Sequence, residues 1–176
     1  MKAQERYDLI QNMVKNFAHL IKTNGFVPNG NRNYYLTRSQ PPFFSLIVKE
    51  LEDYDSLAAM HYLDAMVKEY QFWMNGIDSV NQPGDAVQHV VMLSDGTIMN
   101  RYYDMGDSPR PEAYKEDYAL AQKHPGKEKQ VYKDLRSAAE SGWDFSSRWF
   151  RDGKQLETIH TTDIIPVDLN CLMAHL

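Results

Sequence analysis

The 176-residue sequence lacks features that several protein classes require. It has one cysteine, Cys171, and therefore no intrachain disulfide and no cysteine-based zinc cage. No apolar run approaches the ~20 residues of a membrane helix, and the start of the chain has no continuous apolar stretch typical of a secretory signal peptide. Lysine and arginine are scattered and the formal net charge is −5, which argues against a nucleic-acid-binding surface. We therefore expect no disulfide framework, no membrane span and no nucleic-acid partner.

Short motifs of common enzyme classes are also missing. The sequence contains no G-x-S-x-G, H-E-x-x-H, Walker loop or G-x-G-x-x-G pattern. Its six histidines are dispersed and none pairs at a metal-ligand spacing, so we predict no metal site. Cys171 lies in an apolar helical stretch, where we expect a small buried hydrophobic residue rather than a nucleophile. One thiol fits an oxidising and a reducing compartment equally, so cytoplasmic and exported locations both stay open.

The composition is otherwise that of a globular protein. Hydrophobic residues make up 43% and charged residues 24% of the chain, which predicts a packed core in a single domain. The chain has 11 tyrosines, 7 phenylalanines and 3 tryptophans. Many of these aromatic residues lie in polar stretches rather than on helix faces, and this placement favours a binding cleft.

Apolar periodicity predicts a mainly helical chain. Helices are expected over 2–24, from Pro42, from Asp55 or Ser56 to about Asn75, after Pro111, over 127–139 and after Pro166. Gly25 is expected to end the first of them. The third has an apolar stripe that consists of Leu57, Met60, Leu63, Val67, Tyr70 and Met74. Met60, Met66 and Met74 are expected in the core.

The remaining stretches predict loops and one small hairpin. Residues 25–42 and 141–149 follow neither helical nor strand periodicity, and loops of such length are usually functional. β-favouring runs on both sides of Asp95-Gly96 predict the hairpin. Because the chain begins and ends in a helical pattern with no flanking tail, we expect an all-α protein that is a piece of a larger helical array.

Two polar loop segments hold candidate binding residues. The first is Asn29-Gly30-Asn31-Arg32 followed by Arg38-Ser39-Gln40-Pro41-Pro42. It is either a set of local caps at a helix start or a wall of amide and guanidinium donors around a hydroxyl-rich ligand. The second, Arg110-Pro111-Glu112, is either a functional charged pair or a surface ion pair. Spacing alone does not decide between the two interpretations of either segment.

A third loop segment holds a candidate acid. Asp144 lies between Trp143 and Phe145, with Gly142 before it and Trp149 five residues after it. An apolar aromatic surround disfavours ionisation and raises the pKa of a carboxyl group, as a general acid requires. The alternative is an Asp144 carboxylate that caps a turn.

Four segments strongly resemble the α,α-trehalases. They are PNGNRNYYLTRSQPP at 28–42, SPRPEAY at 108–114, ESGWDFSSRW at 140–149 and TTDIIPVDLN at 161–170. The resemblance covers essentially the whole chain, in the order expected for the middle of the catalytic domain. Members of this family are inverting glycoside hydrolases with an (α/α)6 barrel. The resemblance implies that residues 1–176 form the central part of such a domain, a partial (α/α)6 barrel with long active-site loops and a small β-hairpin.

The resemblance also assigns roles to residues. It implies that Asp144 is the catalytic general acid and that neither a metal nor an organic cofactor takes part. It places eight residues at positions that contact the substrate trehalose: Asn29, Arg38, Ser39, Gln40, Arg110, Pro111, Glu112 and Gly142. These residue types suit a sugar, because the arginines donate hydrogen bonds in a fixed fork and Glu112 accepts from hydroxyls. A glycine also lets the backbone approach the sugar closely.

Two elements of the family have no counterpart in the sequence. The upstream segment that reads roughly PGGRF–REFYYWD is missing, and the catalytic base, a glutamate, belongs to a region downstream. We therefore expect the complete enzyme to need barrel segments on both sides of this chain. With them, it would hydrolyse trehalose to two glucose molecules by a two-carboxylate inverting mechanism. The alternative is an incomplete, non-catalytic fragment that at most binds carbohydrate weakly and exposes apolar helix faces.

Overall fold

Helices and one small antiparallel sheet make up the regular structure of residues 6–176, the part of the chain that this computed structural model describes. The helices are α1 (Tyr7–Asn24), α2 (Phe44–Lys49), α3 (Ala58–Trp73), α4 (Tyr114–Ala121), α5 (Glu128–Glu140) and α6 (Val167–His175). The strands are β1 (Ala86–Val87), β2 (Val90–Met92) and β3 (Ile98–Asn100). Short 3₁₀ turns include Asn33–Thr37, Pro111–Ala113 and Ser147–Trp149.

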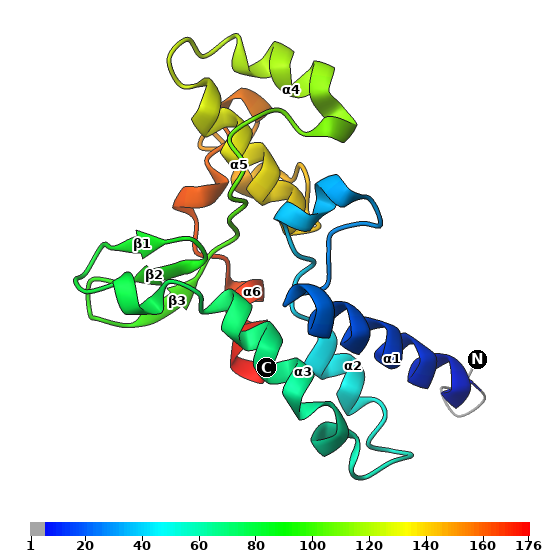
Figure 1. Cartoon of the computed structure of the whole chain (residues 1–176). Helices are drawn as coiled ribbons and strands as arrows, with labels where there is room; N and C mark the ends of the chain where they lie inside the picture. The colour runs from blue at the N-terminus through cyan, green and yellow to red at the C-terminus, as the bar shows by residue number, and fades with distance from the viewer. Residues whose placement is uncertain (1–5) are drawn as a thin grey trace.

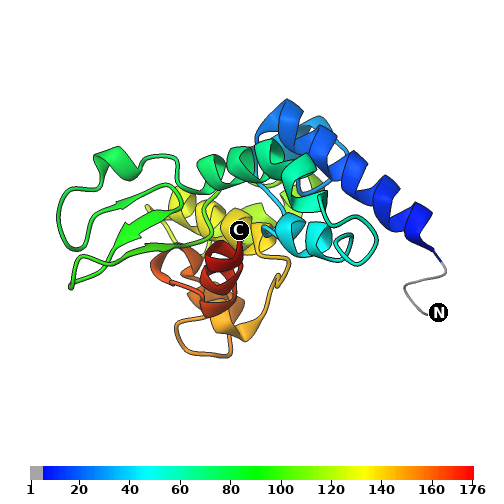
Figure 2. The ribbon, with the colours of Figure 1, turned by 90° about the horizontal axis from the view of Figure 1, so that it is seen from below.

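The helices form two groups that are joined rather than packed into one bundle (Figure 1). In this view α1, α2 and α3 lie together at one end, whereas α4 and α5 lie at the other. Seen from below, the sheet and α1 extend in opposite directions (Figure 2). The result is an open shape in which long loops connect the two groups.

Each group has its own hydrophobic core. In the first, α1 contributes Val14 and Ile21, which pack with Phe44 and Val48 of α2. The second core joins α5, α6 and the loops, and its members include Tyr102, Leu135, Trp149 and Leu169. Trp73 at the end of α3 is fully buried in this second core, whereas Ala58 and Ala65 of α3 belong to the first. α3 therefore ties the two cores together.

Most predicted helix ends are confirmed. Gly25 ends α1 in the left-handed region at φ +94°, and its N–H donates to the carbonyl of Ile21 at 2.7 Å. Residues 2–5 of the first predicted helix lie outside the described residues. The helix expected from Pro42 begins at Phe44, and a 3₁₀ turn beginning at Pro111 precedes α4. α6 follows directly on Pro166.

The predicted hairpin is confirmed and is part of a slightly larger sheet. β2 and β3 pair antiparallel with Val91 opposite Met99, and Asp95-Gly96 lies in the turn between them. Gly96 adopts φ +85°, which explains the need for glycine there. The sequence did not predict β1, which pairs antiparallel with β2. With only two residues, β1 is too short for an alternating pattern to reveal it.

The apolar stripe of α3 is largely exposed, contrary to its expected place in a core. Met60 is 70% exposed, and the other exposed members are Leu57, Leu63, Val67 and Tyr70, at 44–53%. The buried face of α3 consists instead of Ala58, Ala65, Glu69 and Trp73. Periodicity marks an apolar face but does not say what covers it. Within residues 6–176 this stripe has no cover, as expected if the helix belongs to a larger array.

Two other burial predictions are wrong. Cys171 is exposed, because α6 buries Leu169, Leu172 and Met173 on a different face. Of the three methionines expected in a core, Met60 is exposed, whereas Met66 and Met74 are partly buried against the first and second cores, respectively. Each helix therefore buries only the face that another part of the chain covers.

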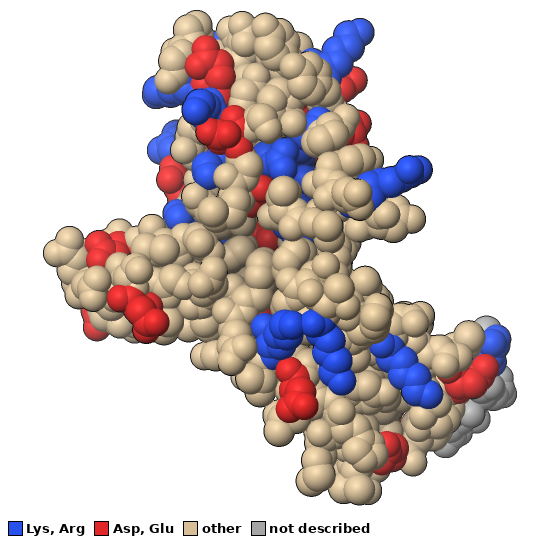
Figure 3. All heavy atoms as spheres, in the orientation of Figure 1, with Lys and Arg blue, Asp and Glu red and all other residues tan. Residues whose placement is uncertain are grey.

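Charged side chains at the surface pair locally. Figure 3 shows lysines and arginines mixed with aspartates and glutamates around α4 and α5. Lys123 lies 2.7 Å from Glu157, and Lys129 lies 3.2 Å from Asp107. All four of these side chains are more than a third exposed, so solvent screens the pairs and each contributes little to stability.

Glu69 is a buried acid that no ion pair or hydrogen bond stabilises among the described residues. Its side chain lies on the buried face of α3, and neither carboxylate oxygen has a hydrogen-bond partner. Burial raises the pKa of Glu69 from about 4.5 to about 8. The folded protein therefore binds a proton at neutral pH that the unfolded chain does not.

This shift predicts that stability falls as the pH rises. Stabilisation from protonated Glu69 is fully present below pH 4.5 and is lost as the pH rises towards 8. The contribution to the unfolding free energy changes by at most about 1.4 kcal/mol per pH unit. Glu69→Gln, which cannot ionise, should abolish this slope and raise stability at pH 8 relative to the parent.

Urea denaturation between pH 5 and pH 8 measures the effect. The matched control is Glu52→Gln in the exposed turn after α2, which should keep the parent's slope. Identical slopes for Glu69→Gln and the parent would contradict the assignment.

Candidate active site

The loop over 25–42 folds back on itself and brings its two polar ends together. The N–H of Asn29 donates to the carbonyl of Arg38 at 3.1 Å, and the N–H of Gln40 donates to the carbonyl of Val27 at 2.7 Å. The Gln40 side chain donates to the carbonyl of Asn29 at 2.9 Å. The 3₁₀ turn Asn33–Thr37 closes the far end of the loop. Two segments that are separate in the sequence thus form one polar surface.

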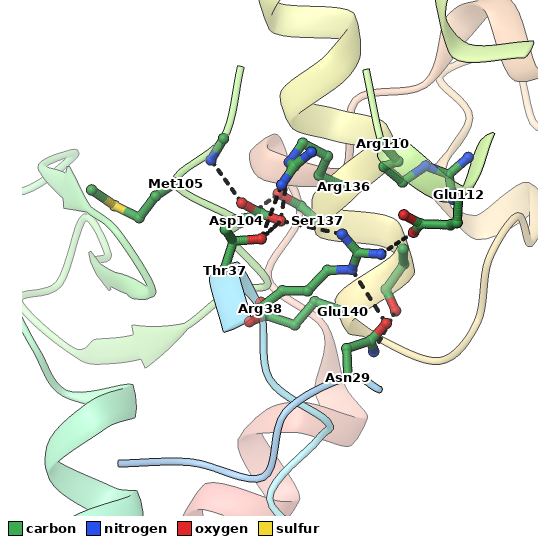
Figure 4. A network of polar contacts seen from close by, with 12 residues as sticks. Asn29, Thr37, Arg38, Asp104, Met105, Arg110, Glu112, Arg136, Ser137 and Glu140 are labelled. Atoms are coloured by element: carbon green, nitrogen blue, oxygen red, sulfur yellow. Dashed lines mark hydrogen bonds and ion pairs between the residues drawn. The ribbon is translucent and has the colours of Figure 1, made fainter. Parts of the chain in front are cut away.

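Arg38 lies at the centre of this surface (Figure 4). Its side chain is 1% exposed, Nε donates to Oδ1 of Asn29 at 3.2 Å, and Nη2 donates to Oε1 of Glu112. Nη1 lies 3.6 Å from Oδ2 of Asp104. The guanidinium also lies over the ring of Tyr35, 5.2 Å from its centroid. A buried guanidinium needs such acceptors, so Arg38 links the two ends of its own loop to the segments that carry Asp104 and Glu112.

Asp104 and Arg136 extend the network towards α5. Oδ2 of Asp104 lies 3.1 Å from Nε of Arg136 and accepts from the hydroxyl of Thr37 at 3.0 Å. A Cβ on Gly106 would collide with the guanidinium of Arg136, so a side chain there would displace it from its place beside Asp104. The network joins the 25–42 loop, the segment after β3 and α5.

Arg110 forms a separate buried ion pair. Its Nε and Nη2 donate to the two carboxylate oxygens of Asp117 at 2.9 and 2.7 Å, and its own N–H also donates to Asp117 at 2.9 Å. Burial alone lowers the pKa of Arg110, but the hydrogen bonds and charge of Asp117, together with the charges of Glu112 and Asp144, outweigh that and raise it.

The pairing within Arg110-Pro111-Glu112 is therefore different from both interpretations of the sequence. Arg110 pairs with Asp117 and Glu112 pairs with Arg38, and the two arginines are buried rather than at the surface. Pro111 starts the 3₁₀ turn that separates the two charges. A charged pair exists at each end of this segment, but not inside it.

The loop that carries Asp144 begins directly at the end of α5. Gly142 adopts φ +71°, which disfavours any residue with a side chain. A Cβ there would meet no other atom within 4 Å, so the backbone at Gly142 borders open space. Open space next to a glycine is compatible with the close approach of a ligand.

The aromatic enclosure predicted around Asp144 does not form within residues 6–176. Asp144 and Trp143 are both exposed, and the guanidinium of Arg148 lies 4.3 Å from the Trp143 ring centroid. Trp149 is fully buried in the second core, and Phe145 lies under the guanidinium of Arg110 at 4.6 Å. The aromatic residues near Asp144 in the sequence thus point to different places, because each has its own partner.

The predicted site residues do converge at the C-terminal end of α5. The Asn29 side chain donates to the carbonyl of Ala139 at 3.2 Å, and the N–H of Ser39 donates to the carboxylate of Glu140 at 3.0 Å. Gly142 and Asp144 follow within four residues. The ring of Phe145, the residue after Asp144, lies under the guanidinium of Arg110 at 4.6 Å, so this loop reaches the second arginine.

One cavity borders predicted site residues, and another does not. A cavity of about 480 Å³ borders Asn29 and Gln40, and its other lining residues include Phe17, Phe43 and Phe44. A polar cavity of about 620 Å³ near the N-terminal half of α5 is lined by none of the predicted site residues.

Among the described residues, no group of three or more His, Cys, Asp or Glu side chains is placed to hold a metal ion. No helix in 6–176 is long and apolar enough to cross a membrane.

Sequence reasoning missed several residues that hold the site together: His89, Asp104, Gly106, Arg136 and Glu140. One signal was available. Arg136 and Glu140 lie four residues apart around a run of small residues, Ser137-Ala138-Ala139, in which charged side chains on a closely packed helix must find partners. His89 and Asp104 gave no such signal, because their partners are distant in the sequence.

Comparison with known proteins identifies the family. A family model described as Trehalase matches residues 1–176. The chain therefore belongs to the trehalase family, and the resemblance seen in its motifs is confirmed.

Individual relatives agree with this assignment. The chain is 53% identical over 169 residues to the periplasmic trehalases of Shigella flexneri serotype 5b (strain 8401) and Escherichia coli (strain K12 / DH10B), a match that covers 95% of this chain. It spans 30% of the length of these relatives. The solved structure of neutral trehalase Nth1 from Saccharomyces cerevisiae matches with a TM-score of 0.58 and 25% identity, over 96% of this chain and 32% of that one. The predicted fold class, a partial (α/α)6 barrel with long loops and a small sheet, is confirmed.

The buried ion pair of Arg110 predicts a large effect on stability. Asp117→Asn replaces one acceptor oxygen by a donor group facing the guanidinium and leaves a buried charge without compensation. Breaking a buried pair in this way costs about 3–5 kcal/mol. Urea denaturation of the chain measures the loss.

The matched comparison is an exposed pair. Lys123→Gln, which breaks the contact with Glu157, should cost no more than about 1 kcal/mol. A similar small loss for both variants would contradict the view that Asp117 is needed to compensate Arg110.

Proposed function

We propose that the protein to which this chain belongs hydrolyses α,α-trehalose to two glucose molecules with inversion, and that residues 1–176 are the central part of its catalytic domain. The observation that carries the proposal is the full-length match to the trehalase family, supported by relatives that are named trehalases. The convergence of the predicted loop residues at the end of α5 adds support from the fold itself.

In the proposed mechanism, Asp144 protonates the bridging oxygen of trehalose as the first glucose leaves. A second carboxylate, supplied from outside this chain, activates a water molecule on the opposite face of the sugar. Inverting enzymes hold two such carboxyl groups roughly 6.5–9.5 Å apart, which leaves room for the water. The reaction forms no covalent intermediate and uses neither a metal nor an organic cofactor.

The remaining residues would bind the sugar or hold the binding residues in place. Trehalose offers hydroxyl, ring and bridging oxygens, so its recognition depends on hydrogen bonds and aromatic contacts. Asn29, Gln40 and the backbone near Gly142 lie next to open space and are suited to direct contact. Arg38 and Arg110 are buried in ion pairs, which hold their side chains in fixed positions. Such fixed arginines would form a rigid wall of the site, with few donors left free for the sugar.

Asp144 needs an enclosure that this chain does not provide. A general acid keeps its proton best where water is excluded, and Asp144 is exposed in residues 6–176. Segments outside the chain would supply the enclosure together with the base. The exposed stripe on α3 likewise needs a cover from such segments.

A complete enzyme for the test can be assembled from this chain and a relative. In the periplasmic trehalase of Escherichia coli (strain K12 / DH10B), the matching 169 residues are replaced by this chain, and the relative supplies the remaining 70% of the enzyme. Asp144→Asn in this chimera keeps the size of the side chain but cannot deliver a proton. Turnover of trehalose should fall by at least the ~10²–10⁴ that acid catalysis contributes.

A second substrate separates acid catalysis from other losses. α-Glucosyl fluoride has a leaving group that needs little protonation, so Asp144→Asn should lose much less activity on it than on trehalose. Asp95→Asn, the same change in the exposed hairpin turn, is the control and should leave turnover unchanged. Near-native turnover of trehalose by Asp144→Asn would remove this residue from the mechanism, and an inactive chimera would contradict the proposed function.

The chain by itself is a candidate non-catalytic fragment. It spans 30% of the length of its relatives, and the acid loop and the α3 stripe are both uncovered in the described residues. Calorimetric titration of the isolated chain with trehalose should therefore give no saturable binding in the micromolar range. Saturable micromolar binding would show that this part of the site is sufficient for recognition.

A further inference from the structure

Glu140 is a fully buried carboxylate that collects donors from three distant segments. It is the last residue of α5 and its side chain has no exposed surface. Oε1 accepts from the backbone N–H of Ser39 at 3.0 Å, and Oε2 accepts from the backbone N–H of Tyr103 at 2.8 Å. Nε2 of His89 lies 3.0 Å from Oε2 and 3.2 Å from Oε1. Figure 4 shows Glu140 next to the Arg38 network.

A buried carboxylate at the C-terminus of a helix costs free energy unless hydrogen-bond donors compensate its charge. A negative charge at a helix C-terminus opposes the helix dipole, and its removal from water adds a further cost. The three donors compensate that cost. Because two of them are backbone N–H groups, Glu140 fixes main-chain segments rather than single side chains.

Both backbone segments lead to Arg38. Ser39 is the neighbour of Arg38 in the predicted substrate-binding segment. Tyr103 precedes Asp104, whose carboxylate faces the guanidinium of Arg38 at 3.6 Å. Glu140 therefore holds the backbone of the arginine and the backbone of its counter-ion at the same time.

The acid loop begins from the same residue. Glu140 is followed by Gly142 and Asp144, two and four residues later. A short connection from a rigid helix end restricts where Asp144 can lie relative to Ser39 and Arg38. One carboxylate thus relates the position of the binding segment to that of the acid loop.

His89 links the small sheet to Glu140. His89 lies between β1 and β2, is 4% exposed, and packs on the rings of Trp73 and Phe72 at centroid distances of 4.6 and 5.0 Å. Packing on two sides fixes the imidazole ring, and the ring in turn fixes the Glu140 carboxylate. His89 thereby connects the sheet to Glu140.

We propose that Glu140 is a positioning residue that holds the segment 38–40 in register with the acid loop after α5. The proposal rests on the proposed function for its catalytic meaning. Its geometric content, the anchoring of Ser39 and Tyr103, stands on the contacts of this chain alone. Glu140 does not touch substrate, because it has no exposed surface.

The first experiment measures anchoring in the whole chain. Glu140→Gln keeps the shape of the side chain but replaces one of its two acceptor oxygens by an NH₂ group, so at least one backbone N–H then faces a donor. Amide hydrogen exchange, followed residue by residue by NMR, should speed up at least tenfold at Ser39 or Tyr103. The matched control is Glu128→Gln at the other end of α5, which should leave both amides unchanged.

The second experiment measures catalysis in the chimera described above. Glu140→Gln should lower kcat/KM at least tenfold for trehalose and by a similar factor for α-glucosyl fluoride, because a misplaced binding segment affects both substrates. The shape of the pH profile should not change. This equal loss distinguishes Glu140 from Asp144, whose substitution should affect trehalose far more than the fluoride.

A second variant covers the case in which Glu140→Gln loses its fold, as judged by its melting temperature. His89→Leu removes one donor and leaves both backbone contacts in place. It should cause a smaller change in the same direction in both experiments.

The outcomes separate the two proposals. Unchanged exchange at both Ser39 and Tyr103 in a folded Glu140→Gln chain would overturn the positioning role, as would unchanged kcat/KM in an active chimera. A loss on trehalose alone would also overturn it, since that pattern belongs to an acid. An inactive chimera with the native Glu140 overturns the proposed function instead, while amide exchange still decides whether Glu140 anchors the two segments.

Discussion

The arrangement of the loops depends on the compensation of one buried positive charge. The guanidinium of Arg38 is almost completely removed from water, and a charge in that position needs acceptors with good geometry. Its acceptors come from Asn29, Asp104 and Glu112, which lie on three separate segments. These segments must therefore meet beside α5, and their meeting produces the polar surface of the candidate site.

α5 can hold this surface because the helix is buried on almost every side. Nine of its residues are buried: Val131, Tyr132, Asp134, Leu135, Arg136, Ser137, Ala138, Ala139 and Glu140. Its apolar side chains pack in the second core, while Arg136 and Glu140 meet charged or backbone partners from the loops. The small residues between these two charges allow neighbouring segments to approach closely. The same helix thus serves as a core element and as a support for the site.

The apolar stripe of α3 is exposed because no described segment covers it. Helices of a barrel have apolar faces on two sides, and each face requires a neighbour. In α3 one face packs against α1 and α2, whereas the stripe of Met60, Leu63 and Val67 has no cover in the described residues. A chain that spans 30% of the length of its relatives would leave such faces uncovered. The loop that carries Asp144 fits the same picture, since Asp144 is exposed among the described residues.

Local elements could be predicted from the sequence because their causes are local. Gly25 ends α1 through a left-handed conformation, Pro166 precedes α6, and Asp95-Gly96 turns the hairpin. The motifs also led to the correct family and to a set of site residues that converge in space. The contacts between distant residues could not be predicted in this way. Arg110 pairs with Asp117 rather than with Glu112, the aromatic neighbours of Asp144 pack on Arg110, on Arg148 and in the second core, and Glu140 connects three loops. Only the tertiary structure decided these contacts, because which charge meets which, and which apolar face is covered, depends on segments that folding brings together from distant parts of the chain.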